Sequence, residues 1–278
     1  MIGAGTPPDT KCPSCGASRR GRYCAECGER FISSEDFELK HFLLEQLPHE
    51  FLHLDGKLLS TMRLLLTQPG ALAENYVAGR RQPFVGPLRV YIFVFLLQVI
   101  VGALVSGGGS SFQERVHDSD PLGVLSYLMS SRPNVDWHSP AVAAHVREIG
   151  HWLSEFATLF IFLLVAAFQK LVFYRLHRRY LEHVALALNV ASFFLAVLTV
   201  CELVLWGVVR ERFGDFEGQL QSILALSALP VYWCLAIRRF YELRMFPAAV
   251  AAIVITFANA VMALGLSTIV YAILIATA

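Results

Sequence analysis

Residues 246–276 read FPAAVAAIVITFANAVMALGLSTIVYAILIA and contain no charged side chain. A helix needs roughly 20 predominantly apolar residues to cross the hydrocarbon core of a bilayer, and this stretch exceeds that length. A second stretch, at residues 184–208, reads VALALNVASFFLAVLTVCELVLWGV and carries a single acidic side chain, Glu202. Helices that are apolar on every face belong in lipid or in a deep core. Both stretches therefore predict membrane-spanning helices.

Three further apolar runs, at residues 88–105, 153–173 and 220–237, predict additional spans, although Gln98 interrupts the first and Pro230 the last. The composition points the same way, because 55% of the 278 residues are hydrophobic and only 16% are charged. The mean hydropathy is +0.53, which is more apolar surface than one soluble core can hide. We therefore predict an all-α membrane protein. About five transmembrane helices occupy residues 85–278, with an outer loop at about residues 106–152.

Basic residues near the span ends predict the orientation, because Lys and Arg in short flanking segments favour the cytoplasm. Three groups of arginines fall on one side of the predicted spans: Arg80, Arg81 and Arg89; Arg175, Arg178 and Arg179; and Arg238, Arg239 and Arg244. The other side has sparse arginines accompanied by many acidic residues. No apolar secretory segment precedes Cys12. We expect a cytosolic N-terminus and an external C-terminus.

Four cysteines form two knuckles, Cys12-Pro-Ser-Cys15 and Cys24-Ala-Glu-Cys27, each followed by a glycine. Two such pairs can wrap one tetrahedral ion. The spacing predicts a zinc ribbon at residues 1–31, with iron as the alternative metal. A site with four thiolates has no open coordination position, so we expect a structural role. Acidic residues offset the nearby basic ones, so the module favours contact with a protein partner over nucleic acid.

Residues 32–84 predict cytosolic or interfacial helices, interrupted near Pro48, at Pro69-Gly70 and at Gly79. Between these breaks an amphipathic pattern repeats at three- and four-residue spacing: Leu58, Leu59, Met62, Leu65 and Leu66. Two interpretations remain open for this helix. It packs against other parts of the protein, or it lies in the headgroup plane of the bilayer.

The sequence His49-Glu-Phe-Leu-His53 matches the H-E-x-x-H motif of zinc proteases. On a helix both histidines would share one face, and Glu50 would polarise a bound water. However, Leu59 stands where the extended motif places a third histidine, and two ligands do not make a catalytic zinc site. A polar interfacial role for His49 and His53 is the preferred interpretation, and a second metal site there is the alternative.

Two other groups of polar side chains are candidates for function. Lys57, Arg80, Arg81 and Arg89 would lie together at the cytosolic surface and clamp an anionic lipid headgroup, or they only set the topology. Glu202 is an ionisable residue within a predicted span, a position that is often functional. It lies close enough to the outer end to reach water, and its role stays undecided.

The segment that leads into the first span resembles a family of uncharacterised bacterial inner-membrane proteins in which a zinc ribbon precedes a domain of unknown function. The likeness covers residues 12–95. It is carried by His53-Leu-Asp-Gly-Lys57, Thr61, Pro69-Gly70, Tyr76, Gly79-Arg80-Arg81 and Pro87-Leu-Arg-Val-Tyr91. The resemblance implies zinc and a location in the bacterial inner membrane, but no activity.

These observations predict a non-enzymatic membrane scaffold, assembly factor or regulator that uses its zinc ribbon to contact a partner. Anionic-lipid binding through the arginine cluster is one alternative. A membrane metallohydrolase that uses His49 and His53 is the other.

Overall fold

The computed structural model describes residues 11–18, 21–31, 56–105, 124–131, 140–208 and 216–277. Apart from two isolated bridges, Lys11 with Ser18 and Tyr23 with Arg30, all regular structure in these ranges is helical. The predicted all-helical class is therefore confirmed. The motif at His49 and His53 and the break near Pro48 lie outside the described residues.

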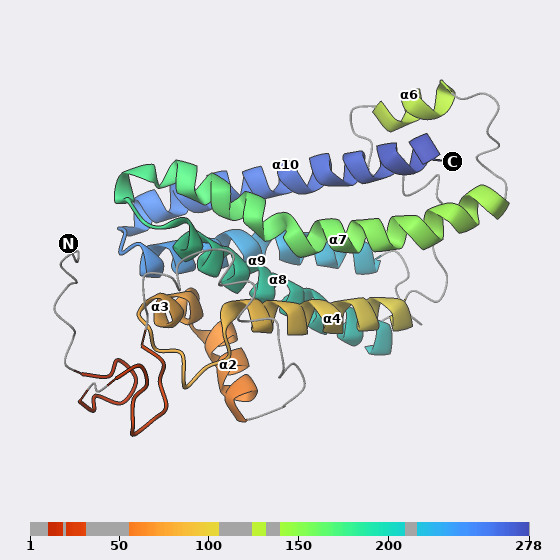
Figure 1. Cartoon of the computed structure of the whole chain (residues 1–278). Helices are drawn as coiled ribbons and strands as arrows, with labels where there is room; N and C mark the ends of the chain where they lie inside the picture. Colours follow the sequence, from red (N-terminus) through yellow and green to blue (C-terminus); the bar gives the residue numbers. More distant parts are fainter. Residues whose placement is uncertain are drawn as a thin grey trace, which may run out of the picture.

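Five long helices form the body of the molecule and run in alternating directions (Figure 1). They are α4 (Pro87–Val105), α7 (Pro140–Val172), α8 (Tyr180–Val208), α9 (Phe216–Phe240) and α10 (Met245–Thr277). Each coincides with one of the predicted apolar runs. Helix α7 begins at Pro140, because the fixed φ of proline suits the first turn of a helix.

Helix α8 lies at the centre of this bundle. It packs against α4, α7 and α9, while α10 packs against α7 and α9. Residues Val184 to Leu188 are each at most 2% exposed, which shows that this part of α8 is covered on every side. An all-apolar sequence is what such a central position requires.

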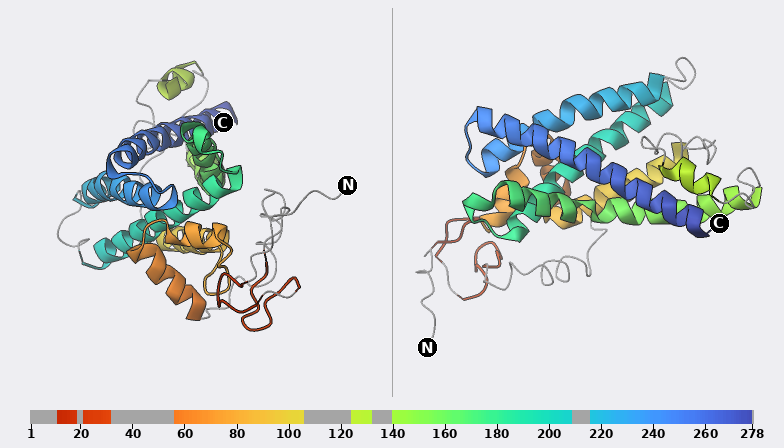
Figure 2. Two further views of the ribbon diagram at one scale, coloured as in Figure 1. Left: turned by 90° about the vertical axis from the view of Figure 1, so that its left-hand side faces the viewer. Right: turned by 90° about the horizontal axis from the view of Figure 1, so that it is seen from above.

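The alternating directions bring the three arginine groups to one end of the bundle. Helix α4 begins there, α7 gives way to α8 through the short η2 (Tyr174–Leu176), and α9 turns into α10. The cysteine module lies at this same end, and the C-terminus lies at the opposite end with α6 (Val124–Ser130) (Figures 1 and 2). The cysteine module and the end of α10 therefore lie at opposite ends of the bundle.

Two helices among the described residues are long and apolar enough to cross a membrane, Tyr180–Val204 and Met245–Ala276. The first is 61% buried within the protein and the second only 17%. Two shorter apolar segments are Pro87–Gly102 and Phe156–Val172. The structure therefore identifies two candidate spans where the sequence predicts about five. The shorter segments lie in α4 and α7, where the described apolar stretch is too short for a full crossing. Helix α9 is neither among the candidate spans nor among the shorter apolar segments.

Two short helices, α2 (Gly56–Thr67) and α3 (Ala71–Val77), pack against the side of the bundle near its arginine-rich end. Gly70 turns the chain between them with a φ of 76°, and a Cβ atom there would lie 2.9 Å from the carbonyl oxygen of Ala236. The Gly70 N–H donates to Asn189 Oδ1 at 3.2 Å, and the Tyr232 hydroxyl donates to the Leu65 carbonyl at 2.8 Å. The predicted break at Pro69-Gly70 is therefore a tight turn inserted against α8 and α9.

Helix α2 packs against the protein through one side and leaves apolar side chains exposed on another. Thr61 and Leu65 are buried against the protein, whereas Leu59 is 78% exposed and Leu66 50% exposed. One face thus packs on the bundle, and a second apolar face is uncovered beside the basic residues Lys57 and Arg63. In Figure 1 this helix runs across the direction of the long helices.

Candidate metal centre and its docking surface

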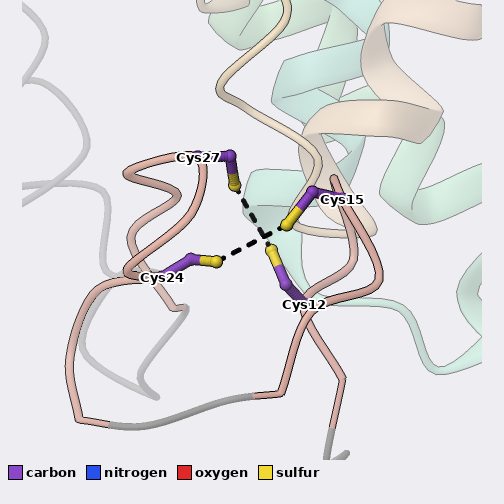
Figure 3. A group of neighbouring side chains, drawn as sticks. All are labelled: Cys12, Cys15, Cys24 and Cys27. Carbon is purple, nitrogen blue, oxygen red and sulfur yellow. Dashed lines mark hydrogen bonds between the residues drawn. The ribbon is translucent and has the colours of Figure 1, made fainter.

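The four knuckle cysteines converge on one point (Figure 3). Their sulfur atoms all lie within 4.8 Å of one another, with 3.6 Å between Cys12 and Cys27 and 3.5 Å between Cys15 and Cys24. Gly16 and Gly28 adopt φ values of 76° and 73°, and their N–H groups donate to the carbonyls of Cys12 and Cys24. The glycine after each pair is needed because a side chain at positive φ is strained. The four predicted ligands thus lie together in a cluster that could hold a metal ion.

The electrostatics of the cluster favour a bound cation. Backbone N–H groups of Cys27 and Glu26 lower the pKa of Cys24 to about 7. At Cys27 the Glu29 N–H lowers the pKa, but desolvation and the neighbouring cysteines outweigh it and raise the pKa to about 12. Four thiols this close cannot all ionise together unless a positive ion compensates their charge. The residues present thus fit a metal ion held by thiolates.

All four ligand positions are supplied by the protein, and soft thiolates in a tetrahedron suit zinc or iron. Bound metal would cross-link two short loops whose shared apolar cluster is small, with Cys12, Cys24 and Phe31 as its buried members. A cluster of this size contributes little to folding, so the ion would act structurally.

Glu29 joins the metal module to the helical body, a role that the sequence does not indicate. Its side chain is 2% exposed, and it accepts a hydrogen bond from the Ser14 hydroxyl at 2.5 Å. The same carboxylate accepts the backbone N–H groups of Arg81 at 3.0 Å and Gln82 at 2.7 Å. One residue therefore bonds both to the first knuckle and to the loop between α3 and α4.

Two of the four residues in the predicted cation cluster contact other side chains of the protein. The Arg80 Nε atom donates to Asn75 Oδ1 at 2.7 Å, and the Arg81 guanidinium lies 4.2 Å from the ring centroid of Tyr76. Lys57 is exposed on α2, and Arg89 is partly buried in the first turn of α4. Arg80 and Arg81 thus interact with their own chain, and their structural roles were not predicted.

Glu202 also lies in a polar contact within the bundle. Gln98 Nε2 donates to Glu202 Oε1 at 2.9 Å, and the Thr199 hydroxyl donates to Gln98 Oε1 at 2.5 Å. The contact joins α4 to α8, whose sequence positions are far apart. It gives Gln98, predicted as an interruption of a span, a partner for its amide group.

In its described residues the protein is all-helical apart from the cysteine module, with a four-cysteine cluster that could hold a metal ion and two apolar helices of membrane-crossing length. Residues 55–99 match the family described as protein of unknown function (DUF3667). This stretch comprises α2, α3, the loop that receives Glu29, and most of α4. No curated protein and no solved structure matches the chain.

Proposed function

We propose that the protein is a non-enzymatic scaffold, assembly factor or regulator of the bacterial inner membrane. Its long helices α4, α7, α8, α9 and α10 cross the bilayer, and a zinc ribbon lies at the cytosolic end. The observation that carries the proposal is the closed cysteine cluster, which is hydrogen-bonded through Glu29 to the segment 55–99. A metal site without an open position organises a surface and does not activate a substrate.

The exposed side chains of the long helices support the membrane part of the proposal. Large apolar groups face outward along α10, including Phe246 at 81%, Ile253 at 64% and Phe257 at 71% exposure. Outward apolar side chains continue on α4 and α7, such as Ile100 and Phe156, both at 57%. A soluble monomer rarely exposes apolar surface this extensive, whereas lipid tails would cover it.

The arginines at one end of the bundle support the proposed orientation. The three arginine groups and the ribbon share one end, and Lys and Arg in short flanks favour the cytoplasm. In the reducing cytosol the cysteines would stay available to metal.

Metal-dependent capture of a partner tests this proposal. The full chain is purified in mild detergent, and the proteins that accompany it are identified and quantified. We expect one zinc per chain and a specific partner that is lost in Cys12→Ser. The Cys201→Ser variant, which alters a thiol outside the ribbon, is the matched control and should keep both. An unchanged set of partners in Cys12→Ser would contradict the role proposed for the ribbon.

The metal analysis also bears on the two alternatives. Two zinc ions per chain, one of them lost in His49→Ala and His53→Ala, would favour the metallohydrolase. Lipid binding through Lys57, Arg80, Arg81 and Arg89 predicts that reversing Arg80 and Arg81 to Glu removes co-purifying anionic lipid. Arg80 contacts Asn75, and Arg81 contacts Tyr76. Because these contacts give both arginines a structural role, we rank lipid binding below the scaffold role.

A further inference from the structure

An open hollow of about 400 Å³ lies where α9 turns into α10. It is lined by Leu235, Arg238, Arg239, Glu242 and Leu243. None of these residues belongs to the metal centre, and the proposed function uses Arg238 and Arg239 only as charges that set the orientation. The hollow combines apolar side chains with charges of both signs.

The residues of the hollow continue an apolar stripe along α9. Val231 is 60% exposed and Leu235 is 37% exposed, one helical turn apart. Arg238 follows three residues after Leu235 and extends the same face toward the arginine-rich end. Glu242 lies in the turn just beyond the end of α9 and lines the same hollow. An amphiphile that lay along this stripe would place its chain on Val231 and Leu235 and its polar head between Arg238 and Glu242.

The two arginines of the hollow differ in the hydrogen bonds that they make with the rest of the protein. Arg239 donates from Nε to Glu74 Oε2 at 2.6 Å and from Nη1 to Gln68 Oε1 at 3.1 Å, which ties α9 to α3. Arg238 and Glu242 have exposed side chains. The hollow therefore presents one fixed cation, one adaptable cation and one carboxylate.

Glu242 stands at a backbone position that would suit glycine better. Its φ is 55°, and the following N–H, that of Leu243, donates to the Arg238 carbonyl at 3.1 Å. This is the geometry of a helix C-terminus at which glycine is the usual residue, because other side chains are strained at positive φ. Strain of this kind is a reason to look for a function of the side chain itself.

We propose that this hollow binds the headgroup of a phospholipid that carries both a phosphate and a primary ammonium group. Arg238 and Arg239 would contact the phosphate, and Glu242 would accept hydrogen bonds from the ammonium. The acyl chains would follow Leu235 and Val231 into the bilayer. The inference rests on the proposal that the bundle spans the membrane, and it adds a specific lipid contact at its cytosolic end.

The test is to incorporate the full-length protein into mixed micelles with equal amounts of ethanolamine, choline and glycerol phospholipids, and to quantify the retained lipids by native mass spectrometry. We expect the ethanolamine lipid to be enriched over the other two. Arg238→Ala should lower its retention roughly fivefold, the upper range for an exposed charged pair. Arg244→Ala, an exposed arginine in the same turn that does not line the hollow, should leave the enrichment unchanged.

Two substitutions at Glu242 separate ligand binding from folding. Glu242→Gln should abolish the preference for ethanolamine over choline while retaining phosphate contact. Glu242→Gly should also abolish it, yet raise the thermal midpoint or leave it unchanged, because glycine relieves the positive φ.

Several results would overturn the inference. They are an unchanged lipid preference in Glu242→Gln, an equal loss of retention in Arg244→Ala and Arg238→Ala, or no preference in the wild type. Complete competition by soluble phosphoethanolamine would show that the site takes a soluble zwitterion and not a lipid. Because these assays begin with the detergent-solubilised membrane protein, a chain that is soluble without detergent would instead contradict the proposed function.

Discussion

At the residue scale, Glu29 is the side chain on which the position of the metal module depends. Replacing it by Gln removes the charge that receives three hydrogen bonds, from Ser14 and from the backbone of Arg81 and Gln82. We expect Glu29→Gln to weaken the docking of the ribbon by about 1–3 kcal/mol. Faster hydrogen exchange of the Arg81 and Gln82 amides would measure the loss.

The matched control for this prediction is Glu26→Gln, which changes an exposed carboxylate in the same knuckle. It should leave exchange at the Arg81 and Gln82 amides unaltered. Both variants should still bind one metal ion, because neither is a ligand. Equal exchange rates in Glu29→Gln and the wild type would show that the carboxylate does not hold the loop.

Metal retention should depend on pH in a direction set by the cysteine thiols. The folded-state pKa of Cys24 is lowered from its ordinary value of 9.0 to about 7 by N–H groups of its own knuckle. The stabilisation of its thiolate is therefore present above pH 9 and is lost as the pH falls through 7. Protons also compete with the metal for the other three cysteines. Zinc release, measured with a chromogenic chelator, should rise as the pH is lowered below 7, and pH-independent release would contradict thiolate ligation.

Gly70 offers a test of the close approach between the α2–α3 turn and α9. A methyl group there would meet the Ala236 carbonyl at 2.9 Å, at a φ of 76°. Gly70→Ala should destabilise the protein by about 1–3 kcal/mol. Gly265→Ala, in the middle of α10 with open space around the new methyl group, should be neutral or stabilising. Thermal unfolding in detergent compares the two, and similar midpoints would show that the turn is not tightly packed.

Individual residues differ in how far the sequence reveals them. The ligand cysteines could be predicted because thiol pairs at this spacing have few other uses. Glu29 could not, since Glu26 in the same module is exposed and nothing in the local sequence separates the two. The contact of Asn189 with Gly70 could not be predicted either, because the two residues are distant along the chain. Contacts of this kind depend on the fold and not on local pattern.

At the scale of elements, α2 is held by one face only, and its two leucine faces should respond differently to truncation. Leu65 is fully buried against the bundle, whereas Leu59 is 78% exposed. Leu65→Ala should lower stability by about 2–5 kcal/mol, as for other buried leucines. Leu59→Ala should change the thermal midpoint little. If the two variants unfolded at the same temperature, the packing of α2 seen here would be wrong.

The long helices could be predicted from hydropathy alone, because each apolar run is long enough to form a helix that is buried in a core or faces lipid. Their neighbours do not follow from it. Placing α2 and α3 beside α9 requires long-range contacts such as Tyr232 with Leu65 and Arg239 with Glu74. The breaks at Pro69-Gly70 and Gly79 were predictable from residue type, and both glycines have positive φ in the structure.

At the scale of the whole molecule, the proposed topology depends on the directions of the long helices and on the positions of the arginine groups. Five alternating helices bring the ribbon and all three arginine groups to one end, and the C-terminus to the other (Figure 2). We propose that this end faces the cytosol, because arginines in short flanking segments favour that side and a reducing environment keeps the cysteines available to metal.

Thiol labelling of intact cells tests that claim most directly. Single cysteines are introduced at Ser18, exposed in the ribbon, and at Ala276, exposed near the end of α10, and labelling by a membrane-impermeant maleimide is compared with the unsubstituted chain. The account predicts that Ala276→Cys is labelled in intact cells and Ser18→Cys only after lysis. Labelling of Ser18→Cys in intact cells, or recovery of the chain in the soluble fraction without detergent, would contradict it.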